Sequence, residues 1–112
     1  MNVLKESKEL TKAELYFLTK AQSIQKMSVL KGQRVDLSQW IIYEDTNMDG
    51  EDQTIFSCMT PEHEVYATNS ASFIRAFYDI LDCFDPADIH SVDIISRTSK
   101  NNREFLTCVY AA

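Results

Sequence analysis

Aromatic and basic side chains that recur along predicted β-strands are the residues of this sequence best suited to chemistry. An aromatic ring can stack on a nucleobase, contributing about 1–3 kcal/mol per base with little regard to base identity, and Lys or Arg can bind phosphates. The candidate stacking rings are Trp40, Tyr43, Phe56, Tyr66 and Phe105. The candidate phosphate-binding residues are Arg34, Arg97, Lys100 and Arg103. Together they predict a surface for single-stranded nucleic acid.

Each ring also has a structural interpretation, because aromatic residues in strands usually lie in the core. By alternation, Phe56 and Phe105 could both face the interior. Tyr43 and Tyr66 are the better candidates for stacking, since tyrosine tolerates exposure. The basic turn between residues 97 and 103 could equally be a solvated hairpin tip.

Motifs for catalysis, cofactors or metals are missing from the sequence. It has two glycines and contains no nucleophile elbow, phosphate-binding loop or dinucleotide fingerprint. Asp45–Gly50 matches the opening of a calcium-binding loop, but Phe56 occupies the twelfth position, where a bidentate Glu is required. His63 and His90 lack the partner spacing of a zinc site. We therefore expect neither an enzyme nor a cofactor nor a bound metal.

The net charge of −6 is unevenly distributed along the chain. Residues 1–35 hold seven Lys or Arg and three Asp or Glu, whereas residues 36–93 hold one and thirteen. An acidic protein is an unusual partner for DNA, but the fold could separate basic and acidic surfaces. The acidic middle also supports an alternative: an interaction module, or an inhibitor that mimics the charge of DNA.

The remaining composition predicts an intracellular protein without a membrane segment. No apolar run approaches the roughly 20 residues of a membrane span, and the first eight residues are too polar for a secretory signal. The three cysteines, Cys58, Cys83 and Cys108, are scattered and odd in number, which favours reduced thiols in a cytoplasmic compartment.

The element pattern predicts one domain over residues 1–112. Thr11 and Glu14 form a capping box that begins a helix over residues 11–20, and the segment before it is expected to be loose. Strands are predicted over residues 34–44, 53–59, 64–68, 89–97 and 103–110. A second helix, residues 70–84, carries apolar side chains at helical spacing.

Three strands, a helix and then a hairpin is the order of the five-stranded OB barrel, in which the second helix would plug the open end. An open α+β sheet with helices on one face is the alternative. The unbroken apolar run Trp40–Tyr43 indicates either a bulge or a strand buried on both faces.

Several short segments, in order, resemble the single-stranded DNA-binding proteins of phages with protein-primed replication and related proteins of phages and mobile elements of Gram-positive bacteria. The segments are Thr54–Phe56, Val65–Ala67, a Ser-initiated helix containing Ile80 and Leu81, and Thr98–Lys100 followed by Phe105.

This resemblance implies an OB fold that coats single strands during replication in the bacterial host cytoplasm. Tyr66, Phe56 and Tyr43 would then lie on the DNA face. The implied partners are single-stranded DNA, replication proteins and further copies of the chain. The capped N-terminal helix has no counterpart in that family, and its two candidate roles are self-association and covering the barrel.

Overall fold

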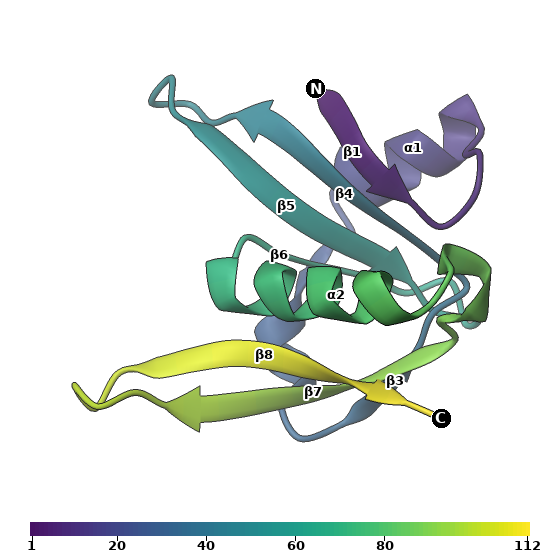
Figure 1. Ribbon diagram of the computed structural model, residues 1–112. Coiled ribbons are helices and arrows are strands. Elements are labelled where there is room, and N and C mark those ends of the chain that lie inside the picture. The colour runs from purple at the N-terminus through teal and green to yellow at the C-terminus, as the bar shows by residue number, and fades with distance from the viewer.

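Two β-sheets pack on either side of helix α2 (Ala71–Cys83) in the computed structural model, which describes residues 1–112 (Figure 1). In sheet order, the five-stranded sheet consists of β1 (Asn2–Glu6), β4 (Gln39–Thr46), β5 (Asp52–Met59), β6 (Val65–Thr68) and β2 (Gln25–Lys26). The three-stranded sheet consists of β3 (Arg34–Asp36), β7 (Ser91–Thr98) and β8 (Glu104–Ala111). Helix α1 (Lys12–Thr19) and two short 3₁₀ turns, Met27–Leu30 and Pro86–Asp88, complete the chain.

Local sequence signals place both helices and their neighbouring turns as predicted. The Thr11 hydroxyl accepts the Glu14 amide at 3.2 Å, and the Glu14 carboxylate accepts the Thr11 amide at 2.8 Å. Ser70 caps α2. In the hairpin turns, Gly50 and Asn102 take the positive φ angles of 78° and 59° that these residue types tolerate.

The predicted strand over residues 34–44 is divided by a sharp corner. Before the corner β3 pairs with β7, and after it β4 pairs with β5. The corner residues alternate between the sheets, because the Leu37 amide donates to the His90 carbonyl and the Ser38 amide to the Met59 carbonyl, both at 2.8 Å. One continuous segment therefore contributes a strand to each sheet.

The two sheets do not close into a barrel. At one edge of the five-stranded sheet, β6 pairs with the short parallel strand β2 and not with β8. The hydroxyls of Ser70 and Ser72 donate to the Leu106 carbonyl at 3.3 and 2.6 Å, so the start of α2 occupies the edge of β8. An open seam remains between β6 and β8, and the fold is a mostly-β arrangement of eight strands and two helices.

The expectation that the segment before Thr11 is loose is wrong, because residues 2–6 form β1 along the edge of β4. Four of its five side chains are exposed and the fifth is partly so. A strand held mainly by backbone pairing has no alternating burial pattern to detect in a sequence.

The main core fills the space between the sheets with rings from β4, β5 and α2. Phe56 is fully buried, with its ring centroid 6.3 Å from that of Trp40, 5.2 Å from Phe73 and 4.6 Å from Phe77. On the opposite face of the five-stranded sheet, Leu18 of α1 covers a second apolar cluster. Strand β4 is therefore buried on both faces, which is one of the two predicted explanations of the apolar run Trp40–Tyr43.

Thiol reactivity should distinguish the three cysteines. Burial raises the pKa of both Cys58 and Cys108 to about 12, whereas Cys83 is exposed. Since the thiolate is the reactive form, a disulfide reagent at pH 8 should modify one thiol rapidly in the native protein and three after unfolding in urea. The Cys83→Ser variant should lose the rapid reaction, and rapid modification of two or more native thiols would contradict this burial.

None of the helices has the length and apolar character needed to cross a lipid bilayer.

Candidate nucleic-acid interface

Four of the five rings predicted to stack on bases are buried, so that prediction is wrong for them in this conformation. Trp40, Phe56 and Tyr66, which are 1%, 0% and 6% exposed, point into the main core. Tyr43, which is 4% exposed, points to the other face and lies in the cluster beneath α1. Phe56 faces the interior, as alternation allowed, but Tyr66 shares that face and Tyr43 lies on the other one, and both faces are covered.

The two buried tyrosines keep their hydroxyls close to carboxylates. The Tyr66 hydroxyl donates to Glu64 at 2.5 Å, and this hydrogen bond, with some burial, raises the pKa of Tyr66. Burial and then the nearby Asp45 charge raise the pKa of Tyr43. Both phenols therefore stay protonated at neutral pH.

The fifth ring, Phe105, is half-buried and lies at the seam between β6 and β8. Directly opposite it on β7 is Arg97. Arg97, Lys100 and Arg103 are exposed and form no ion pair, so their charges are available at the β7–β8 hairpin. The structure thus brings four of the predicted residues together.

Arg34 is separate from this group and already has a partner. Its guanidinium donates to both oxygens of Asp93 on β7, at 2.8 and 3.3 Å. This contact lowers the pKa of the Asp93 carboxyl and raises that of Arg34. The pair joins β3 to β7, and neutralisation by Asp93 weakens the argument that Arg34 holds a phosphate.

A groove follows the open seam and continues past the start of α2; we call it the seam groove. It consists of three hollows of about 450, 400 and 570 Å³. The first two share Ser28 and Thr68, and the last two share Gln53 and Asn69, so the three are contiguous. The lining residues are Leu4, Lys26, Met27, Ser28, Lys31, Gln53, Thr54, Ile55, Ala67, Thr68, Asn69, Ser70, Ala71, Ile74, Arg75, Tyr78, Glu104, Phe105 and Leu106.

The seam groove is basic although the protein is acidic. Three cations line it, Lys26, Lys31 and Arg75, against a single carboxylate, Glu104. Glu104 is bound by Lys31, and this contact lowers the pKa of its carboxyl. Arg75 is the sole cation of residues 36–93, and it lies in this groove.

Acidic side chains collect in a different hollow, at the β4–β5 hairpin. This cavity of about 260 Å³ is lined by Glu44, Asp45 and Asp52 together with the N-terminus. Lys20 and the N-terminal ammonium bind Asp45 there, at 2.8 and 3.9 Å. Figure 1 shows the β4–β5 and β7–β8 hairpins extending to the same side of the molecule, on either side of α2. The basic groove and the acidic hollow are therefore distinct but adjacent, since burial and then the nearby Glu44 charge raise the pKa of Tyr78, which lines the groove.

Sequence reasoning missed most residues of the seam groove. Lys26 lies in a two-residue strand, which is too short to predict. Gln53 and Asn69 lie near the ends of different strands, and the Asn69 side-chain amide donates to the Gln53 side-chain oxygen at 3.3 Å. The one available signal was Arg75, an isolated cation in a strongly acidic stretch. No cluster of three or more His, Cys, Asp or Glu side chains is arranged to hold a metal ion.

Comparison with protein-family models, curated proteins and solved structures gives no match.

Proposed function

We propose that this chain binds single-stranded DNA in the seam groove, without sequence preference and without acting on the DNA chemically. The observation that carries the proposal is the concentration of cations in a continuous groove of a protein whose net charge is −6. A basic track combined with accessible rings is the general arrangement for sequence-tolerant binding of single strands.

Each part of the groove has a role in this proposal. Lys26 and Arg75 hold phosphates along the track, and Lys100 and Arg103 extend it at the β7–β8 hairpin, whereas Lys31 is already paired with Glu104. Bases stack on the half-buried rings of Phe105 and Tyr78. The side-chain amides of Gln53 and Asn69 offer both donors and acceptors to base edges.

We also propose that the fold is an OB arrangement whose barrel is left open at the seam. Support comes from the segment that turns from β3 into β4 and contributes to both sheets, and from the antiparallel pairing of β3 with β7. Strands β5, β6, β7 and β8 and helix α2 follow the predicted chain order. In this interpretation the start of α2 lies between β6 and β8, where direct pairing of those strands would close the barrel.

Binding should appear in a fluorescence anisotropy titration of labelled oligothymidine of about 16 nucleotides, the upper end of the site sizes of single OB folds. Affinity should fall as salt rises, with a log–log slope of about −0.7 for each phosphate contacted. A duplex of equal length should bind more weakly, because a stiff duplex cannot follow the groove. Absence of binding to the single strand at the lowest salt would reject the proposed function.

The label belongs on the DNA, because intrinsic fluorescence is a poor reporter here. Trp40 is 1% exposed and cannot stack on an added base in this conformation. Weak tryptophan quenching is therefore compatible with binding.

The acidic hairpin supports a second candidate function, that of a protein-binding module. Only four of the seventeen acidic residues form ion pairs, and Met48 at the β4–β5 tip is fully exposed. Such a module would bind a basic protein surface and would show no affinity for DNA. The same anisotropy titration separates the two candidates.

A further inference from the structure

The outer face of strands β4, β5 and β6 continues from the seam groove to the area beneath α1. Ile55 lines the groove and also packs against the apolar cluster under the helix. Its register partner on β4 is Tyr43, which lies within that cluster. Ala67 lines the groove as well, and its register partner on β5 is Ser57. The groove floor and the covered face are therefore one surface.

Two polar atoms on or beside this covered face have no partner. The Ser57 hydroxyl is fully buried and makes no hydrogen bond, and the Gln39 side-chain carbonyl oxygen is likewise unpaired. Leaving a buried polar group unpaired is unfavourable, so such groups in native proteins call for an explanation. A surface built only to receive a helix would not need a hydroxyl at Ser57.

Helix α1 is held on this face by a small apolar cluster. It has eight residues, of which Leu18 is buried, and the partly buried Leu15 and the flanking Leu10 and Ile24 pack against the same cluster. Tyr16 and Phe17, which are 54% and 50% exposed, point away from the sheet. Local opening is least costly where few apolar contacts are lost.

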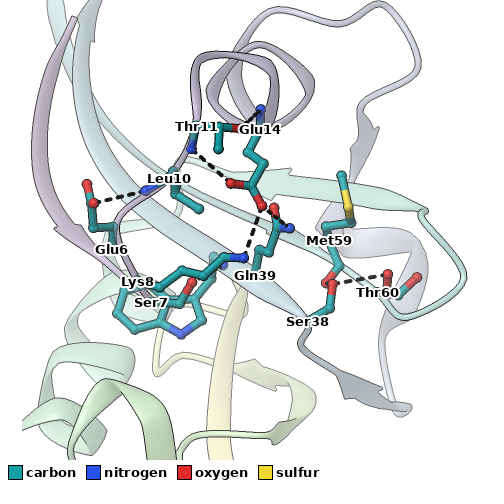
Figure 2. A network of polar contacts seen from close by, with 11 residues as sticks. Glu6, Ser7, Lys8, Leu10, Thr11, Glu14, Ser38, Gln39, Met59 and Thr60 are labelled. Atoms are coloured by element: carbon teal, nitrogen blue, oxygen red, sulfur yellow. Dashed lines mark hydrogen bonds and ion pairs between the residues drawn. The ribbon is translucent and has the colours of Figure 1, made fainter.

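Polar contacts converge on Glu14 at the start of α1, and one of them, from Gln39, ties the helix to the sheet (Figure 2). The Glu14 carboxylate accepts the Thr11 amide at 2.8 Å and the Gln39 amide group at 2.5 Å, and it pairs with Lys8 at 3.1 Å. These contacts lower the pKa of Glu14. At the other end, Lys20 pairs with Asp45 at 2.8 Å. Exposed polar contacts exchange readily with water.

We propose that α1 is a displaceable cover, and that its release lengthens the seam groove across β4–β6 so that Ser57 and Tyr43 contact further bases of a long single strand. This inference rests on the single-stranded DNA binding proposed above. A strand that fits within the seam groove leaves the cover closed. A longer strand gains contacts only with the open form, and it therefore shifts the population toward that form.

The test compares two labelled oligothymidines, of about 4 and about 16 nucleotides, which bracket the site sizes of single OB folds. Leu18→Ala loosens the cover while retaining helix propensity. We expect about tenfold tighter binding of the longer oligonucleotide, because the binding-competent fraction rises, and unchanged binding of the shorter one. Ile80→Ala, a comparable truncation on α2 outside the groove lining, is the control and should not strengthen binding of either.

Ser57→Ala provides a readout that a structural role would not produce. Its hydroxyl has no partner under the cover, so stability should be unchanged or higher. Loss of a hydrogen bond to DNA should weaken binding of the longer oligonucleotide by about two- to tenfold and leave the shorter one unaffected. In addition, amide hydrogen exchange in α1 should accelerate when the longer oligonucleotide saturates the protein.

The outcomes separate the two proposals. If the wild-type protein binds neither oligonucleotide, the proposed function fails and the cover fails with it. If both bind but Leu18→Ala weakens binding in parallel with Ile80→Ala, or if α1 exchanges more slowly in the complex, the cover is overturned and DNA binding stands.

Discussion

Replacing Phe56 by alanine should lower the free energy of unfolding by about 3–5 kcal/mol, the usual cost of truncating a buried Phe. Its ring is fully buried between β5 and α2 and contacts Trp40, Phe73 and Phe77. Removing it leaves a cavity that the surrounding sheets cannot fill without shifting. Such a loss is a large part of the stability of a domain of this size.

Urea denaturation monitored by circular dichroism would measure the change. Tyr16→Ala is the matched control, because that ring is 54% exposed and its loss should change stability by no more than about 0.5 kcal/mol. If Phe56→Ala left stability intact and abolished DNA binding, Phe56 would be a stacking ring after all and its core position would be wrong.

The double variant Lys100→Ala, Arg103→Ala should weaken binding of single-stranded DNA by about 10- to 100-fold at low salt. Both side chains are exposed at the β7–β8 hairpin and form no ion pair, so their full charge is available to phosphates. Loss of two phosphate contacts should also reduce the steepness of the salt dependence by about 1.4. Anisotropy titrations over a series of salt concentrations give both quantities.

A control with the same change in net charge is the double variant Lys5→Ala, Lys12→Ala. These two lysines are exposed, form no ion pair and lie outside the seam groove. Their loss should change affinity only slightly, through the overall field of the protein. Equal weakening by the two double variants would mean that net charge, and not the hairpin, governs binding.

Some features of this fold depend on local sequence and others on long-range contacts. Helix α2 is an example of a feature that depends on local sequence. Ser70 before it and the apolar spacing of Phe73, Phe77 and Ile80 are contained in about fifteen consecutive residues. The capping box at Thr11 and the turn residues Gly50 and Asn102 are similarly short-range. For this reason both helices, and most strands within two or three residues, could be predicted from the chain alone.

Strand β1 and the open seam, in contrast, depend on long-range contacts. Strand β1 forms because it pairs with the edge of β4. Its side chains are almost all exposed, so residues 2–6 carry no alternating apolar pattern that would predict this pairing. The seam stays open because Ser70 and Ser72 bind the Leu106 carbonyl, a contact between positions more than thirty residues apart. Pairings of this kind depend on where distant segments meet.

The candidate site depended on tertiary structure most of all. Strand alternation in the sequence determines which side chains of one strand share a face, but the pairing of Tyr43 with Tyr66 as exposed stacking rings is wrong, because Tyr66 lies with Trp40 and Phe56 in the main core and Tyr43 lies on the opposite face. Whether a face meets water is decided by what packs on it: α2 and the second sheet cover one face, and α1 covers the other. Alternation reports the direction of a side chain relative to a sheet, whereas its exposure depends on the layers that pack on that sheet. For this reason the groove lies at the seam, and Phe105 is the one predicted ring that lines it.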